Sequence, residues 1–483
     1  MIKILVKGHN GFYGLGDVLR LFYGNVKEDR EAGYVCSQAP YDLLIVSEAG
    51  DMVHTYIEGE KELWDRTFAA KFGPQIEVKR EIKRQLYYLL SLKTGKTFPW
   101  GSLTGIRPTV VAAEVRSAEE LTDRYLVRPD KAKLCMETFK IETEVLNREA
   151  EDALNIYIGV PFCPSRCAYC SFVSQEISHH LDKVPLYAQA LINEIRLTGP
   201  RLKKVSSLYM GGGTPTVFSD GDFEQVIRAI KDFIPLEKDA EITIEAGRPD
   251  TITPRKLQVL KECGIGRICI NPQTLCDETL RKFNRKHTTE DFLDVFEKAR
   301  KTGFDVINTD LIAGLNDERP EELLESLEKL LVLMPENITI HTLYKKRRAN
   351  LKREQVLGGF SAAEGLGDRR LDEVLAKAYE MLEDKGYKPY YMYRQKDTSH
   401  GLENVGFALE GTECLYNVAM MSDKRDVLAM GAGSVSKRMF GGGRLERFSM
   451  PKDVLIYMRD LEENIGRRSD FFEDGVDDEM SQM

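Results

Sequence analysis

The sequence predicts an α/β protein whose central part, from about Asn155 to Tyr344, is a partial (β/α)6 barrel. Short apolar runs rich in β-branched residues alternate there with helical patterns, and this unit recurs about six times. Such alternation is typical of a parallel sheet, either in a barrel or in an open doubly wound arrangement. Unusual polar residues follow the predicted strands. Barrels place their active sites at this end of the strands, so these residues favour the barrel.

Six strands are predicted in this region, at 155–160, 205–210, 240–246, 266–270, 304–313 and 337–344. Helices are predicted between them at 186–197, 220–233, 253–263, 289–301 and 320–333. Ser219 and Asp220 are residue types that cap the start of a helix, and Pro320 suits a first helical turn.

The remaining chain divides into three further parts. Residues 1–150 lack the rhythm and are predicted to form an N-terminal α/β domain of unknown role, with a strand at 2–7 and a helix at 79–92. The barrel domain is assigned to 151–369, and a smaller C-terminal α+β region, with a helix at 371–385, to 370–470. Residues 471–483 are acidic, and a disordered tail is expected there.

Composition limits the classes of function. The chain has 483 residues, 42% of them hydrophobic and 30% charged, which permits a large core. Its net charge of −9 argues against non-specific binding to nucleic acid. There is no apolar run of the ~18 residues that a membrane span needs, and the start shows no signal peptide, so a cytoplasmic location is expected.

Three of the nine cysteines, Cys163, Cys167 and Cys170, lie close together in a C-x3-C-x2-C pattern directly after the first strand. In a reducing compartment this pattern indicates a metal or redox site. A cubane iron–sulfur cluster takes four thiolates, so three would leave one iron open to a cofactor or substrate. Zinc, with His179 or His180 as a further ligand, is an alternative, and three ordinary thiols are another.

A glycine triplet, Gly211, Gly212 and Gly213, follows the second strand and precedes Thr214. Three glycines let the backbone approach a ligand closely, although a plain tight turn would look the same. Because the cysteine loop follows a neighbouring strand, this edge is predicted to bind a small polar molecule.

The segments YIGVPFCPSRCAYCSF, YMGGGTPT, IEAG, INPQT and NTDLIAGL occur in this order. With them the sequence resembles the oxygen-independent coproporphyrinogen III oxidase family of radical S-adenosylmethionine (SAM) enzymes. The resemblance is strong over 155–314 and weaker over 414–437. The N-terminal extension, with TGIRPT at 104–109, resembles that of a longer bacterial subgroup of coproporphyrinogen dehydrogenases.

The resemblance implies a [4Fe–4S] cluster on the three cysteines, with SAM chelating the open iron. It implies that the glycine triplet contacts the methionine part of SAM and that Thr214 is a further cofactor-binding residue. Acidic residues would face amino or hydroxyl groups and an arginine the carboxylate. The further residues that match SAM-site positions of the family are Tyr157, Glu245, Gln273, Arg285 and Asp310.

The implied reaction is the conversion of coproporphyrinogen III to protoporphyrinogen IX in haem biosynthesis. SAM would be cleaved to a 5′-deoxyadenosyl radical that removes a hydrogen atom from a propionate side chain, and loss of carbon dioxide would leave a vinyl group. The cluster and SAM would carry the chemistry, so no catalytic side chain is assigned. A reduced flavodoxin- or ferredoxin-type protein would supply the electron.

Two positions depart from the oxidases: Phe172 stands where they have a further cysteine, and Gly159 where the family tends to have histidine. A sister group of haem-handling proteins has phenylalanine at the first position, but its usual His-Asn pair is Tyr416-Asn417 here. A haem- or tetrapyrrole-binding transfer protein that keeps the cluster is therefore an alternative, as is an enzyme with another substrate.

A cationic segment with Lys345, Arg347 and Arg348 follows the sixth strand in this acidic chain. Arginine can hold a carboxylate with two hydrogen bonds, and lysine adds a point charge. These residues are predicted to bind the propionates of the substrate. A solvated loop is the alternative.

Overall fold

The computed structural model describes residues 2–23, 27–29, 33–35, 43–50, 52–59, 63–68, 75–170, 175–316, 319–343, 366–395, 401–440 and 444–473. The chain separates into two compact units. Unit 1 comprises Met1–Phe139, Leu357–Asp372 and Met392–Asn404, and unit 2 comprises Lys140–Val356, Glu373–Tyr391 and Val405–Met483. The first unit thus ends near residue 139 rather than 150, and it includes two later segments that the sequence did not assign to it.

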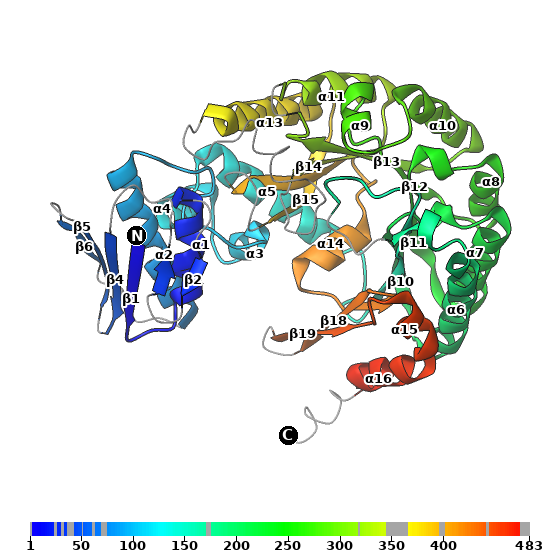
Figure 1. Cartoon of the computed structure of the whole chain (residues 1–483), viewed down its shortest axis with the longest axis horizontal. Coiled ribbons are helices and arrows are strands. Elements are labelled where there is room, and N and C mark those ends of the chain that lie inside the picture. The colour runs from blue at the N-terminus through cyan, green and yellow to red at the C-terminus, as the bar shows by residue number, and fades with distance from the viewer. Residues whose placement is uncertain are drawn as a thin grey trace. The chain divides into compact units, whose positions relative to one another are not determined.

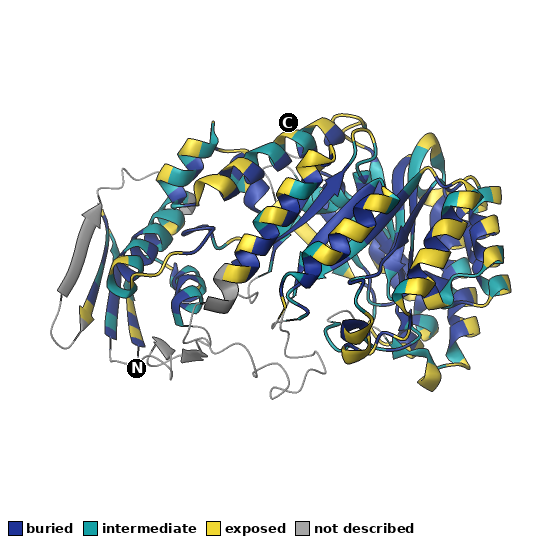
Figure 2. Ribbon diagram, turned by 90° about the horizontal axis from the view of Figure 1, so that it is seen from above, coloured by how far each residue is buried: buried dark blue, intermediate teal, exposed yellow. Residues whose placement is uncertain are grey.

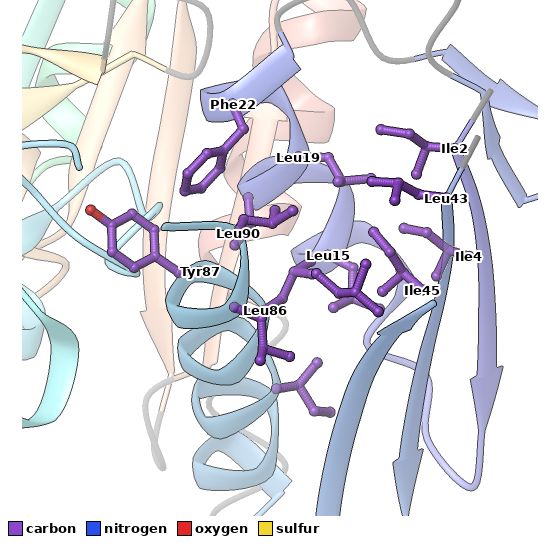
Figure 3. Close-up of a cluster of buried hydrophobic side chains, with 14 of the residues drawn as sticks. Ile2, Ile4, Leu15, Leu19, Phe22, Leu43, Ile45, Leu86, Tyr87 and Leu90 are labelled. Carbon is purple, nitrogen blue, oxygen red and sulfur yellow. The ribbon is translucent and has the colours of Figure 1, made fainter. Parts of the chain in front are cut away.

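Unit 1 is built on a four-stranded sheet in the order β1-β4-β5-β6. β1 runs parallel to β4, and the later strands are antiparallel. Two helices cover this sheet, and Leu15 of one and Leu86 of the other pack with Ile4 and Ile45 of the strands (Figure 3). The elements of this part of the chain are β1 (Ile2–Lys7), α1 (Phe12–Tyr23), β2 (Lys27–Asp29), β3 (Gly33–Val35), β4 (Leu43–Ala49), β5 (Val53–Gly59), β6 (Leu63–Phe68), α2 (Gln75–Thr94), α3 (Pro108–Ala112), α4 (Ala118–Tyr125) and α5 (Pro129–Leu146).

A buried ionic cluster joins distant segments of unit 1 around Glu403. The Glu403 carboxylate accepts hydrogen bonds from Trp100 Nε1 at 2.7 Å and from Lys131 Nζ at 2.5 Å. Lys131 Nζ also lies 3.3 Å from the Asp372 carboxylate. Burial lowers the pKa of Lys131, but the two carboxylates outweigh it and hold that pKa above its ordinary value. Removing one partner would leave a buried charge without compensation.

Unit 2 contains six parallel strands that neighbour one another in chain order, as a partial (β/α)6 barrel requires. They are β7 (Leu154–Val160), β10 (Val205–Gly212), β11 (Leu236–Gly247), β12 (Arg267–Ile270), β13 (Val306–Ala313) and β14 (Asn337–Thr342). All six predicted strands are present, and the fold class predicted from the sequence is confirmed.

The helices of the barrel lie along the outer side of these strands (Figure 1). Along these helices the residues that face the strands are buried, and those on the outer side are exposed (Figure 2). Ser219 caps α7 by accepting a hydrogen bond from the Asp222 amide, and Thr288 and Asp291 form a capping box on α10. These helices are α6 (Lys183–Thr198), α7 (Asp220–Phe233), α8 (Pro254–Glu262), α9 (Asp277–Lys282), α10 (Thr289–Thr302) and α11 (Glu322–Leu333).

Strands from the C-terminal part extend the sheet at both edges. β17 pairs with β7 in parallel and continues into β18 and β19, and β16 pairs antiparallel with β14. α14 lies on the opposite face of the strands from the outer helices (Figure 1). These elements are α13 (Leu366–Asp384), β15 (Lys388–Arg394), β16 (Glu403–Ala408), α14 (Leu415–Ser422), β17 (Val427–Met430), β18 (Val435–Phe440), β19 (Arg444–Ser449), α15 (Val454–Arg459) and α16 (Leu461–Glu473).

The end of the chain is attached to the barrel through Glu194 of α6. Its buried carboxylate accepts hydrogen bonds of 2.5 Å from both Arg468 and Tyr457. Because α16 continues to Glu473, residues 471–473 are helical and not part of a disordered tail. Residues 474–483 lie outside the described residues. In the described part of the chain, the helices are too short or too polar to cross a membrane.

Candidate active site

The carboxyl ends of the parallel strands bring the predicted site residues to one edge of the sheet. The register of β10 with β7 sets Gly211 opposite Gly159 and Gly212 opposite Val160. The cysteine loop begins where β7 ends, at β8 (Phe162–Cys163). The amide of Gly213 donates to the carbonyl of Val160 at 2.7 Å, so the glycine triplet and the start of the cysteine loop are joined.

The cysteine loop presents three partly exposed thiols. The amide of Cys170 donates to the carbonyl of Cys167 at 3.0 Å and forms a tight turn. Thr214 Oγ1 lies 3.6 Å from the Cys163 sulfur. The loop therefore has both backbone support and a hydroxyl donor directed at one of its sulfurs.

Two guanidinium groups approach the Cys167 sulfur: Nη1 of Arg285 lies 3.8 Å from it and Nη1 of Arg248 lies 4.0 Å from it. A thiolate is the form of cysteine that binds metal, and two cations at this distance would offset part of the negative charge of a bound cluster. Hydrogen bonds to cluster sulfurs are also one of the features that set the reduction potential of an iron–sulfur centre.

Arg285 is buried, not a surface arginine of a loop. Its Nη2 donates to the carbonyl of Asn271 at 2.6 Å, and its Nη1 donates to the hydroxyl of Tyr169 at 3.1 Å. Its Nε and the Asn271 Oδ1 are buried and have no hydrogen-bond partner within the described residues. Such groups leave hydrogen-bonding capacity for a bound polar molecule.

Arg248 was not among the residues singled out from the sequence. β11 has a bulge between Glu245 and Gly247, and Gly247 has a φ of +61°. The chain then turns Arg248 towards the cysteine loop, where Nη1 donates to Ser165 Oγ at 3.1 Å. Asp250 orients the guanidinium through two bonds of 2.8 Å. The sequence does show an arginine directly after the strand that carries Glu245. It could not show that this arginine turns towards the cysteine loop, because the bulge leaves no trace in the sequence pattern.

Close packing leaves little room for a side chain at any of the three glycines of the triplet. A Cβ on Gly211 would lie 2.3 Å from Glu245 Oε2, and one on Gly212 would lie 2.9 Å from the Tyr157 hydroxyl. Gly212 also has a φ of +103°, which other residues rarely adopt. A Cβ on Gly213 would lie 2.4 Å from the Phe162 carbonyl oxygen. Side chains of the site would have to shift to admit a Cβ at Gly211 or Gly212, and backbone carbonyls take the space of a Cβ at Gly213.

Two acidic residues, Glu245 and Asp310, lie close enough to repel each other. Burial raises the pKa of Glu245 to about 7, and the charge of Asp310 adds to this effect. Asn308 Nδ2 donates to Asp310 at 2.9 Å, and His341 Nε2 lies 3.6 Å from the same carboxylate. Such a pair is suited to groups that donate hydrogen bonds or carry positive charge.

Gln273 lies next to Asp310 through the backbone. Its amide donates to the Asp310 carbonyl at 2.9 Å, and its own carbonyl accepts from the Ile312 amide at 2.9 Å. Its φ of +71° is unusual for a residue other than glycine. The structure thus places Gln273 at the same edge as the acidic pair.

Tyr157 forms a stack with two tyrosines that the sequence did not connect to it. The rings of Tyr209 and Tyr416 lie 4.9 Å apart, and the rings of Tyr157 and Tyr416 lie 6.0 Å apart. Burial raises the pKa of all three hydroxyls. The stack forms an aromatic wall next to Gly212 and Glu245.

Of the two positions that depart from the oxidases, the structure describes Gly159 but not Phe172. A Cβ on Gly159 would have its nearest neighbours at 3.4–3.5 Å, which is ordinary contact, so a small side chain fits there. Phe172 lies outside the described residues, as do Lys345, Arg347 and Arg348. Those three substrate contacts therefore stay a prediction.

The zinc alternative receives no support from geometry. His180 Nδ1 lies 3.3 Å from Lys183 Nζ. Within the described residues, no three Cys, His, Asp or Glu side chains converge on one point as a mononuclear metal site requires. The thiolates of a [4Fe–4S] cluster bind different irons and need no common point. The arrangement fits a cluster with a polar cofactor. It has three thiols on one loop, donors directed at two of their sulfurs, and polar atoms nearby that have no hydrogen-bond partner within the described residues.

Comparison with known proteins agrees with this geometry. The family model of the radical SAM superfamily matches residues 157–330. The "oxygen-independent coproporphyrinogen-III oxidase-like protein HemZ" of Bacillus subtilis is 34% identical over 475 residues, 92% of each chain. The chain therefore belongs to the same family of radical SAM proteins as this HemZ protein. The family implies SAM and a [4Fe–4S] cluster.

Other relatives in the family carry different names. The heme chaperone HemW of Haemophilus influenzae is 27% identical and covers 63% of this chain and 76% of its own length. The solved structure of coproporphyrinogen III oxidase HemN from Escherichia coli has a TM-score of 0.53 at 23% identity, over 68% of this chain and 73% of that one. This likeness concerns the fold alone.

Proposed function

We propose that this family member is an enzyme that oxidatively decarboxylates coproporphyrinogen III to protoporphyrinogen IX without oxygen. The similarity to the Bacillus subtilis oxidase-like protein over 92% of the chain is the observation that supports this reaction most. The site adds support, because its polar groups and its glycine edge suit a small, charged cofactor.

In this proposal Cys163, Cys167 and Cys170 hold the [4Fe–4S] cluster. Glu245 and Asp310 accept hydrogen bonds from amino and hydroxyl groups of SAM, and Arg285 binds its carboxylate. The backbone of Gly211–Gly213 provides the edge along which the methionine part lies. When bound, the cluster and SAM would supply a 5′-deoxyadenosyl radical that can remove a hydrogen atom from a propionate. The substrate would then lose carbon dioxide and one electron to leave the vinyl group, and a one-electron acceptor would take up that electron. The protein positions the cofactor and the substrate and excludes water.

A second candidate is a haem-binding transfer protein, because relatives in the family are named heme chaperones. Haem iron can take a tyrosine as an axial ligand, in place of the histidine that the haem-handling proteins have at this position. Tyr416 is only 6% exposed, and burial raises the pKa of its hydroxyl, which disfavours the phenolate that iron binds. This observation favours the enzyme.

Product analysis separates the two candidates. Reconstituted protein is incubated anaerobically with SAM, a reductant and coproporphyrinogen III, and the porphyrinogens are oxidised and separated by chromatography. The enzyme yields protoporphyrin. Stable binding of haem without any turnover would support the transfer protein instead.

A further inference from the structure

We propose that Tyr187 of α6 is a positioning residue for the cysteine loop, and that Glu194 couples it to the C-terminal helices α15 and α16. The inference rests on the cluster and the SAM of the proposed function, and it does not depend on the tetrapyrrole. We call Tyr187, Glu194, Tyr457 and Arg468 the C-terminal network.

The network binds backbone groups at the point where β17 leaves β7. The first amide after the last pair of these strands, that of Gly431, donates to Glu194 Oε2 at 2.8 Å. The next amide, that of Ala432, donates to the Tyr187 hydroxyl at 3.0 Å. This hydroxyl in turn donates to the carbonyl of Gly159 at 2.6 Å. Side chains of α6 therefore satisfy buried backbone groups where the pairing ends, and they fix the place where the two strands separate.

The Tyr187 ring also packs against the residue that precedes the first cysteine. The ring of Phe162 meets that of Tyr187 edge-on, with centroids 5.4 Å apart and 83° between the planes. The Phe162 carbonyl accepts a hydrogen bond from the Thr214 amide at 2.7 Å, and the Val160 carbonyl accepts one from the Gly213 amide at 2.7 Å. Tyr187 thus contacts a short segment to which both the cysteine loop and the glycine edge are attached. A shift of this segment would move a cluster ligand and the SAM edge together.

Glu194 connects this segment to α15 and α16, which lie beside α6 (Figure 1). Besides the amide of the β17 end, its carboxylate accepts hydrogen bonds of 2.5 Å from Tyr457 of α15 and from Arg468 of α16. The Tyr457 ring lies 5.3 Å from that of Tyr187. Arg468 Nη1 also donates to the carbonyl of Ala429 in β17 at 2.7 Å. The C-terminal helices therefore hold the Glu194 carboxylate in place through a buried ion pair and a tyrosine.

Packing without an influence on the site is the alternative, since all four side chains of the network are buried. The hydrogen bonds favour positioning. The Tyr187 hydroxyl accepts from the chain that follows β17 and donates to β7, three residues before Phe162. The two backbones touch there, because a Cβ on Gly431 would lie 2.2 Å from the Gly159 carbonyl oxygen. Loss of the hydroxyl would leave a buried amide and a buried carbonyl to find new partners, and the start of the loop would shift.

Tyr187→Phe removes this hydroxyl and keeps the ring against Phe162. The matched control is Tyr387→Phe, which removes an equally buried hydroxyl that donates to the Pro335 carbonyl at 2.5 Å. Pro335 precedes β14, so the control lies at the end of the strands opposite to the cysteine loop. Equilibrium dialysis measures the affinity for labelled SAM. Electron paramagnetic resonance measures how SAM changes the g-values of the reduced cluster.

We expect Tyr187→Phe to bind SAM about tenfold more weakly and to show an altered SAM-dependent change in g-values. Tyr387→Phe should match the wild-type protein in both measurements. Tyr457→Phe, which removes one hydrogen bond from Glu194 and leaves Tyr187 in place, should weaken SAM binding by about threefold. Iron content and the denaturant midpoint of unfolding are measured for all variants. If Tyr187→Phe does not retain its cluster, Tyr457→Phe decides the question.

Wild-type SAM affinity and g-values in Tyr187→Phe with an intact cluster would overturn the positioning role. Equal losses in Tyr187→Phe and Tyr387→Phe would also overturn it, since they would indicate a general loosening of the fold. Wild-type SAM affinity in Tyr457→Phe would overturn the coupling to the C-terminal helices. A wild-type protein that bound neither cluster nor SAM would instead contradict the proposed function, so the two failures are distinguishable.

Discussion

The amide of Gly212 donates a hydrogen bond of 3.3 Å to Oε2 of Glu245, and this bond joins the end of β10 to the end of β11. A Cβ on the preceding Gly211 would lie 2.3 Å from the same oxygen. The glycine triplet and the carboxylate are therefore parts of one surface, and a change in either should affect the binding of SAM.

Gly212→Val should weaken SAM binding by at least tenfold, about 1.4 kcal/mol, while the cluster content stays normal. The reason is steric, because a Cβ there would lie 2.9 Å from the Tyr157 hydroxyl at a φ of +103°. Equilibrium dialysis with labelled SAM and iron analysis provide the measurements. Gly221→Ala is the control, since a Cβ at Gly221 meets nothing within 4 Å. Normal SAM affinity in Gly212→Val would show that the triplet is only a turn.

SAM affinity should fall as the pH is lowered from 7.5 to 6. The pKa of Glu245 is raised to about 7 by burial and by Asp310, so its carboxyl group takes up a proton in this range. A protonated carboxyl group accepts hydrogen bonds from an amino group less well, and the proton must be lost when SAM binds. Titration calorimetry at several pH values measures the effect. Glu245→Gln should bind SAM weakly with a smaller pH dependence, and an equal dependence in both proteins would contradict this role.

Arg248→Gln should lower the reduction potential of the cluster. The reduced cluster has one more negative charge, and the Arg248 guanidinium, 4.0 Å from the Cys167 sulfur, stabilises it. A tenfold shift of the equilibrium towards the oxidised cluster corresponds to about 59 mV. Redox titration followed by electron paramagnetic resonance measures this shift. In Arg248→Lys the reduction potential should fall less than in Arg248→Gln. In Arg228→Gln, which changes an exposed residue of α7, it should not change. A normal reduction potential in Arg248→Gln would mean that Arg248 only supports the structure of the cysteine loop.

Replacing Arg347 and Arg348 with alanine should raise the KM for a porphyrinogen with four carboxylates and leave substrate-free SAM cleavage near normal. Arginine binds carboxylates by two hydrogen bonds, and part of the attraction acts at long range. The effect on KM should therefore shrink as salt increases. Steady-state kinetics at two salt concentrations test it. Unchanged kinetics at low salt would return this segment to a solvated loop.

Periodicity was sufficient to predict the barrel, because the pattern of each strand and outer helix reflects its own burial. It could not reveal α9, whose six residues are too few to show a helical period. The strands β15 to β19 were also missed. Two of them, β17 and β16, join the barrel strands β7 and β14 through pairings between segments far apart in the sequence. Most residues of the candidate site could be found from the sequence because they follow the predicted strands, and the strands themselves were predictable.

The site residues that the sequence did not reveal depend on tertiary structure. Arg248 reaches the cysteine loop only because a bulge at Gly247 turns it there. Tyr416 comes from α14, far along the chain, yet it stacks on Tyr209. The buried position of Arg285 is likewise set by its bonds to Asn271 and Tyr169 rather than by any local pattern.

The proposed reaction can be tested by measuring three quantities in one anaerobic reaction with coproporphyrinogen III deuterated at the propionate carbon that loses hydrogen. These quantities are the protoporphyrinogen formed, the 5′-deoxyadenosine formed and its deuterium content. We expect the protein to form both products and deuterium to appear in the 5′-deoxyadenosine. Cys167→Ala should form neither product and should lack the cluster. Normal iron, sulfide and SAM cleavage in Cys167→Ala would contradict the cluster assignment, and 5′-deoxyadenosine without deuterium and without protoporphyrinogen would contradict the reaction.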